Sequence, residues 1–319
     1  MATPIEHIYL SFMTTRFSVL KEHWKKNAVL KNTGRLGTNK EIGREVDLGG
    51  IFIEFDWKNK KTVNSVEMKS PSGMADCGAN LAVASMRENK IYIFEKQNLK
   101  IVGEINHPLF NDLHSITLTD KKTLLVVATG LDSILEISQE GELLWRWTAF
   151  ENGYTTDQYG ETRNLDMTGN TDYRVIDFPT LHQTTHVNSA ISNNNFVFAT
   201  LFHQGQLIRI QKTTGEITVL LGGLKNPHAV RFLSDEKLML SDTGTGDIVI
   251  VPIEGGEPER MNVETKWLQD SIAKNESTYL AAKTDENEIV EFDQIEGRQI
   301  SSYSFNPEWR FYGFEFKEA

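Results

Sequence analysis

The chain has 319 residues, of which 39% are hydrophobic and 10% aromatic, enough apolar side chain for the packed core of one large domain. Its formal net charge of −11 argues against a nucleic acid or an anionic membrane as the main partner, because both bind basic surfaces. The single cysteine, Cys77, excludes a disulfide within the chain. Neither a secretory signal nor an apolar run of membrane-spanning length is present, so we expect a cytoplasmic protein that acts on a small-molecule substrate.

A pair of short apolar strands joined by a polar turn recurs along the chain. The first pair covers 81–85 and 91–94, and each pair is preceded and followed by a further apolar strand. Four short strands with Gly, Asp and Asn turns, repeated about every 42 residues, are typical of a β-propeller blade. The other pairs are 124–129 with 134–137, 196–200 with 207–210, 238–242 with 248–251, and 279–282 with 289–292.

The sixth blade is divided between the two ends of the chain. Residues 311–316 predict one strand near the C-terminus, and 7–12, 50–55 and 62–66 predict three near the N-terminus. Joining them closes the ring and removes the open sheet edges that would otherwise invite aggregation. We therefore predict an all-β fold, a six-bladed β-propeller that forms a single domain over residues 1–319.

The spacing of the innermost strands supports this count. The residues that open them are predicted to be separated by 42, 72, 42, 41 and 43 positions. The long interval contains a polar insertion at about 150–181, and a second insertion at about 15–48 contains a candidate helix at 17–24. Both are expected on the same face, as lids over a site or as an oligomer contact. The six register positions are Ser72, His114, His186, His228, Gln269 and Tyr312.

Three register positions on consecutive blades are histidines, and they are predicted to converge in the central channel. Neutral imidazoles at one point are a common way to hold a divalent metal ion, so His114, His186 and His228 are candidate ligands. Zn, Fe, Mn and Cu are not distinguished by this pattern, and a site without metal is the other possibility. On the neighbouring blades, Gln269 is a candidate substrate contact and Tyr312 a candidate general acid.

A rim around this ring is expected from the loops between second and third strands and from the insertions. His203 and Arg87 are the candidate catalytic residues there, because an imidazole or a guanidinium can orient an anionic group. Arg16 and Ser72 are candidate substrate contacts. His182 lies four residues before His186 and is a candidate extra ligand.

Part of the chain, about residues 110–252, resembles the bacterial arylsulfotransferases and their propeller relatives. The likeness is carried by residues 141–147, 186–189, 203–204, 214–217, 221–223 and 227–228. It implies a six-bladed propeller in which a channel histidine, here His228, is transiently sulfated with His114 and His186 in support. The family has an arginine before its His-Gln pair, where this chain has Phe202, a further candidate substrate contact. Without that cation, sulfuryl transfer loses an important electrostatic stabilisation of its transition state.

Three functions remain open from the sequence. The leading hypothesis is a metal-assisted lyase or hydrolase that uses the three-histidine site in the channel. The second is metal-free group transfer through His228, as the resemblance implies. The third is a non-catalytic propeller that binds a ligand or a protein on its face.

Overall fold

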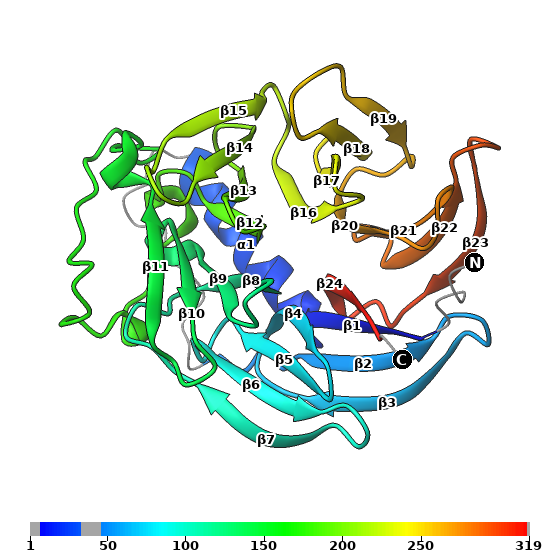
Figure 1. The fold of residues 1–319 in the computed structure, drawn as a ribbon. Coiled ribbons are helices and arrows are strands. Elements are labelled where there is room, and N and C mark those ends of the chain that lie inside the picture. Colours follow the sequence, from blue (N-terminus) through cyan, green and yellow to red (C-terminus); the bar gives the residue numbers. More distant parts are fainter. Residues whose placement is uncertain (1–6, 33–45, 318–319) are drawn as a thin grey trace.

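The structure is a computed structural model that describes residues 7–32 and 46–317. Within these ranges it contains six four-stranded antiparallel sheets arranged as a ring (Figure 1). The predicted six-bladed β-propeller is therefore confirmed. In the same ranges, no helix combines the length and the apolar character that crossing a membrane requires.

Five blades are each built from consecutive strands, with the first strand innermost. The first consists of β4 (Pro71–Cys77), β5 (Asn80–Ser85), β6 (Lys90–Glu95) and β7 (Lys100–Ile105), and the second of β8 (Leu113–Leu118), β9 (Leu124–Ala128), β10 (Ser133–Ile137) and β11 (Leu143–Thr148). The third consists of β12 (Val187–Ser192), β13 (Phe196–Leu201), β14 (Gln206–Gln211) and β15 (Ile217–Leu221), and the fourth of β16 (Pro227–Phe232), β17 (Lys237–Asp242), β18 (Asp247–Pro252) and β19 (Glu259–Asn262). The fifth consists of β20 (Leu268–Ala273), β21 (Thr278–Lys283), β22 (Glu288–Asp293) and β23 (Arg298–Ser304).

The sixth blade closes the ring with strands from both ends of the chain. Its order is β24 (Arg310–Phe316), β1 (His7–Thr14), β2 (Ile51–Asp56) and β3 (Lys61–Glu67). Strand β24 pairs antiparallel with β1, and Phe311 and Phe314 are buried in the core that this blade shares with β20–β23. The predicted closure, one C-terminal strand with three N-terminal strands, is confirmed.

The core lies between neighbouring blades because each strand presents alternate residues to opposite faces of its sheet. Strand β9 illustrates this. Leu124 and Val126 pack toward the preceding blade, whereas Leu125 and Val127 pack toward the following one. A strand buried on both faces reads in sequence as a continuous apolar run, as residues 124–128 do.

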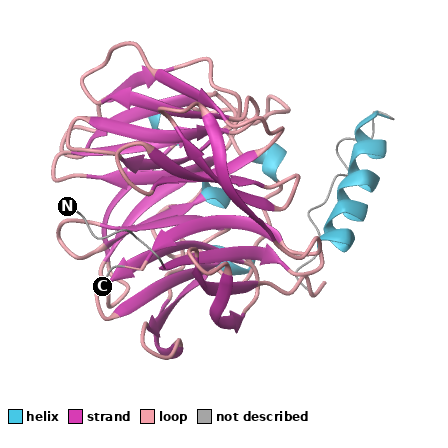
Figure 2. Ribbon diagram, turned by 90° about the vertical axis from the view of Figure 1, so that its right-hand side faces the viewer, coloured by secondary structure: helices cyan, strands magenta, loops and turns pink. Residues whose placement is uncertain are grey.

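The two insertions lie at one end of the ring. The first contains α1 (Phe17–Asn32), which is longer than the predicted helix at 17–24 and stands beyond the strand ends on one side of the propeller (Figure 2). Phe17 and Leu20 anchor it by packing on Leu48. The second insertion contains three short 3-10 helices, η3 (Phe150–Asn152), η4 (Tyr173–Val175) and η5 (Thr180–His182).

Candidate functional site

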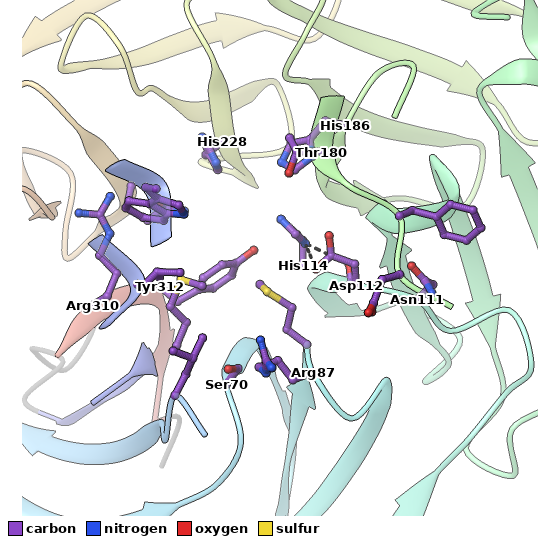
Figure 3. A pocket seen from close by; sticks show the side chains of 18 of the residues that line it. Ser70, Arg87, Asn111, Asp112, His114, Thr180, His186, His228, Arg310 and Tyr312 are labelled. Atoms are coloured by element: carbon purple, nitrogen blue, oxygen red, sulfur yellow. Dashed lines mark hydrogen bonds and ion pairs between the residues drawn. The ribbon is translucent and has the colours of Figure 1, made fainter. Parts of the chain in front are cut away.

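A cavity of about 270 Å³ opens at the end of the central channel that both insertions flank. This volume is just below the range of roughly 300–1,000 Å³ usual for small-molecule sites. Figure 3 shows side chains from several blades directed into it. Its walls are formed by Ser70, Met86, Arg87, Asn111, Asp112, His114, His186, His228, Trp267, Gln269, Arg310 and Tyr312 from the blades, by Met13, Leu20, Trp24 and Leu48 from β1 and the first insertion, and by Asp177, Phe178 and Thr180 from the second.

The structure brings five of the six register residues together at this cavity: His114, His186, His228, Gln269 and Tyr312. The innermost strand of each blade carries a β-bulge or irregular register close to these positions. Bulges re-aim side chains and are frequent beside functional sites. His186 directly precedes its strand and has a φ of 47°, a left-handed conformation that a non-glycine residue adopts only when its surroundings hold it.

A second layer of cavity residues lies two positions before the register residues. It consists of Ser70, Asp112, Trp267 and Arg310. These residues lie at or just before the start of the innermost strands, so this layer extends the ring toward the mouth of the channel. The predicted rim lay in the loops between second and third strands, and of its candidate residues there Arg87 lines the cavity, next to Met86. The position two residues before each register residue is the sequence signal that identifies Ser70, Asp112, Trp267 and Arg310.

Each of the three histidines is held through Nδ1. His114 Nδ1 lies 3.0 Å from the Asp112 carbonyl oxygen and His228 Nδ1 lies 2.9 Å from that of Asn226. The Nδ1 atom of His186 contacts the side-chain oxygen of Gln183. Because these partners are acceptors, Nδ1 carries the hydrogen, and Nε2 keeps its lone pair. Within 7–32 and 46–317, the Nε2 atoms have no hydrogen-bond partner.

Burial keeps two of these imidazoles neutral. It lowers the pKa of His228 to about 3, with the charges of His114 and Arg310 contributing in the same direction. It lowers the pKa of His186 well below its ordinary value, and neighbouring histidines add to the effect. Burial also raises the pKa of Tyr312 well above its ordinary value, so its phenol keeps its proton. These three side chains therefore present neutral groups to the cavity.

His114 differs from the other two because a carboxylate stands behind it. Asp112 Oδ1 lies 3.7 Å from His114 Nδ1, so a protonated imidazole would form an ion pair there. The rings of His114 and Tyr312 are 5.8 Å apart and nearly perpendicular, and Figure 3 shows the Tyr312 hydroxyl directed toward the middle of the cavity. The imidazole of His114, backed by a carboxylate, thus faces the phenol of Tyr312.

The predicted three-histidine metal site requires three Nε2 atoms around one point. The rings of His114 and His186 are 5.0 Å apart, but Phe202 packs against both His186 and His228, at 4.8 and 5.4 Å. Neutral imidazoles with anchored Nδ1 atoms suit a metal chemically. However, within the described ranges no three His, Cys, Asp or Glu side chains are grouped so that they could hold an ion. Metal binding stays a prediction that this arrangement does not favour.

A buried ion pair fixes His186 and the second insertion. Asp132 is fully buried and accepts the backbone N–H groups of Thr184, Thr185 and His186 at 2.8–2.9 Å. Arg163, from the insertion, pairs with the same carboxylate at 3.0 Å. This clamp holds the backbone of His186 in its left-handed conformation and ties the insertion to the propeller.

Three predicted substrate contacts lie outside the cavity wall: Ser72, Arg16 and Phe202, whose ring packs against those of His186 and His228. The Ser72 hydroxyl is fully buried and donates to the Leu113 carbonyl oxygen at 2.6 Å, so it joins two neighbouring blades. Arg16 projects to the surface and pairs with Asp47 at 3.0 Å. Neither Ser72 nor Arg16 is placed where it would touch a molecule in the cavity, because each is held by a structural partner.

Two histidines of the predicted rim also lie behind the wall. His203 Nε2 lies 3.1 Å from the Thr180 carbonyl oxygen, so it supports a residue that lines the cavity without lining it. His182 pairs with Asp157 at 2.9 Å and does not join the three register histidines. Both anchor the second insertion.

The sequence matches no family model and no curated protein. Solved structures are similar in fold. The nidogen/laminin complex aligns with a TM-score of 0.64 at 10% identity, covering 97% of each chain. Virginiamycin B lyase from Staphylococcus aureus aligns with a TM-score of 0.51 at 14% identity over 75% of this chain and 71% of its own. The β-propeller domain of Cps50 (Swd1) from Myceliophteria thermophila aligns at 0.53 and 13%, over 81% and 80%. At these identities the likeness establishes the propeller fold alone.

Proposed function

We propose that the protein is a lyase-type enzyme that removes a proton from a small organic molecule bound in the cavity, without a metal ion. The observation that carries this proposal is the His114–Asp112 pair facing Tyr312. A base that becomes charged and an acid that starts neutral are the two groups that an elimination needs. His114 is the proposed base and Tyr312 the proposed acid.

The proposed step is an elimination. His114 Nε2 takes a proton from carbon, the C–H electron pair becomes a new double bond, and the bond to a leaving oxygen or nitrogen breaks. That leaving atom takes the phenolic proton of Tyr312. The imidazolium is stabilised by Asp112 at 3.7 Å, and its proton returns to Tyr312 as product departs. A positioned acid or base typically contributes about 10²–10⁴-fold to rate.

The remaining cavity groups fit roles in orientation. His186 and His228 stay neutral, so their Nε2 lone pairs can accept hydrogen bonds from substrate hydroxyl or amino groups. Gln269 lines the same wall, and its Oε1 accepts from Trp267 Nε1 at 2.8 Å, which leaves its amide NH₂ as a donor. These groups can position the polar substituents of a bound molecule, and positioning is a large part of catalysis at such sites.

The fold accommodates this class of reaction, since one of the similar propellers bears the name of a lyase. A metal-assisted reaction, as predicted from the sequence, would need the three Nε2 atoms to converge. Because no three His, Cys, Asp or Glu side chains are grouped to hold an ion in the described ranges, at least one of these histidines would have to move, and the ring of His228 is packed with its centre 5.4 and 6.2 Å from those of Phe202 and Trp267. The metal-free reaction requires no such rearrangement.

The test is incorporation of deuterium from D₂O into carbon-bound positions of a small-metabolite extract, followed by NMR. Wild-type protein should exchange or convert at least one compound, and His114→Gln should lose that activity by about 10²-fold or more. His107→Gln, a histidine outside the cavity wall, is the matched control. Undiminished activity in His114→Gln, or activity that disappears with a chelator and returns with a divalent ion, would contradict the proposal.

Group transfer through His228, as the arylsulfotransferase resemblance implies, is a second candidate. One observation favours it: His228 is neutral, its Nε2 is open, and the charge of Arg310 is close enough to influence it. A cation near that nitrogen could replace the arginine whose place Phe202 takes. Incubation with an aryl sulfate and mass spectrometry of the intact protein would reveal a sulfated His228, which His228→Gln should abolish.

A further inference from the structure

Arg310 is a buried cation with hydrogen-bonding capacity left over. It lies at the start of β24, its side chain is 8% exposed, and it lines the cavity. Only Nη1 has partners, the Thr284 carbonyl oxygen and Asp285 Oδ1, both at 3.3 Å. Within residues 7–32 and 46–317, Nε and Nη2 have none. A guanidinium carries five N–H donors, so most of this group's capacity is unused.

The charge of Arg310 is only weakly balanced by its protein partner. The Asp285 side chain is 47% exposed, and an ion pair of that kind is strongly screened by water. Burial lowers the pKa of Arg310, with Asp285 opposing that effect, but an arginine keeps its charge. A buried charge without a good partner is costly, and an anionic ligand would offset that cost.

Two aromatic rings of the first insertion hold the guanidinium in place. The Cζ atom of Arg310 lies 4.9 Å from the ring centre of Phe17 and 5.8 Å from that of Trp24. The two rings meet edge to face at 5.8 Å. Cation–π contacts of this kind orient a planar cation without consuming its N–H donors. The rings of Phe17 and Trp24 on α1 therefore fix the orientation of the planar Arg310 guanidinium.

We propose, on the basis of the proposed function, that the substrate is a monocarboxylate with an apolar or aromatic body. Its carboxylate binds Nε and Nη2 of Arg310. Figure 3 places Arg310 on the opposite side of the cavity from Asp112, with His114 and Tyr312 between them. The carboxylate would thus lie at the cationic end, and the reacting carbon near His114.

The rest of the wall agrees with one negative charge on an apolar molecule. Met13, Leu20, Trp24, Leu48 and Trp267 supply apolar surface near the mouth. Asp112 and Asp177 also line the cavity, and their negative charges disfavour a polyanion. Arg87 lines the wall as a second cation, but one of its nitrogens already donates to the Val46 carbonyl oxygen at 3.2 Å.

The test compares benzoate with benzamide, which has the same shape and no charge, by calorimetric titration. Wild-type protein should bind benzoate at least about 10-fold more tightly, the size of one charge-assisted hydrogen-bonding contact. Arg310→Gln should abolish that preference, and Arg310→Lys should keep only part of it because lysine lacks the planar fork. Arg209→Gln is the matched control, since Arg209 also stacks on an aromatic ring, Phe196, outside the cavity wall.

Equal binding of benzoate and benzamide to wild-type protein would overturn the inference. So would an unchanged preference for benzoate in Arg310→Gln, provided that its melting temperature shows the variant to be folded. Tighter binding of inorganic phosphate than of benzoate would overturn the carboxylate class. His114→Gln should still prefer benzoate to benzamide, because Arg310 is intact. Loss of exchange activity in that variant with benzoate binding intact supports both proposals, whereas retained exchange activity refutes the proton-transfer function alone.

Discussion

Replacing Asp132 with alanine should strongly destabilise the propeller, because this carboxylate joins His186, the second insertion and Arg163. The side chains of Asp132 and Arg163 are 0% and 6% exposed. Alanine would remove the acceptor of three backbone N–H groups and leave the guanidinium buried without its carboxylate. Breaking one side of a buried ion pair costs about 3–5 kcal/mol.

Urea denaturation followed by tryptophan fluorescence measures this cost. With an m value of about 3 kcal/mol per molar urea, the midpoint should fall by roughly 1 M or more. Glu151→Ala, which breaks the surface pair with Arg146 in the same insertion, is the control and should cost about 1 kcal/mol or less. If both variants lose less than about 1 kcal/mol, Asp132 does not hold the insertion as argued.

Three further predictions concern the histidine ring, the closure of the propeller and the helix. Because burial lowers the pKa of His228 to about 3, the unfolded chain binds the proton more readily, so the free energy of unfolding should fall as pH falls from about 6.5 toward 3. His228→Gln should show a flatter dependence in that window, and an unchanged slope would refute the assignment. Ending the chain after Asn306 removes β24 with the buried Phe311 and Phe314, each worth about 3–5 kcal/mol, so the product should aggregate or unfold by size-exclusion chromatography and circular dichroism. A folded monomer would contradict the closure. Trp24→Ala should weaken benzoate binding several-fold, because Trp24 contacts Arg310, and should change the melting temperature little, because Trp24 is 44% exposed. An unchanged affinity for benzoate would show that α1 takes no part in binding.

The propeller could be predicted from sequence because its information is local and periodic. Continuous apolar runs such as residues 124–128 mark strands buried between blades, and their repeat counts the blades. The ring of His114, His186, His228, Gln269 and Tyr312 followed from the same repeat. These features depend on spacing alone, which the sequence displays directly.

The rest of the site depends on contacts that spacing does not display. Ser72 occupies a register position, yet its hydroxyl is used by a neighbouring strand. Phe202 packs against the rings of both His186 and His228, and among the described residues no three candidate ligands are grouped to hold an ion, which weakens the metal prediction. Arg310 belongs to the site because residues of α1, almost three hundred positions earlier in the chain, stack on it. Such long-range pairings appear only when the chain is folded.

The most direct test of the proposed mechanism separates proton removal from product formation in Tyr312→Phe. With the compound identified in the exchange screen, this variant should still exchange its carbon-bound hydrogen with D₂O, because His114 and Asp112 are intact. Its rate of elimination should fall by about 10²-fold or more, because the leaving atom no longer receives a proton. Elimination at the wild-type rate, or loss of exchange together with elimination, would contradict the assignment of His114 as base and Tyr312 as acid.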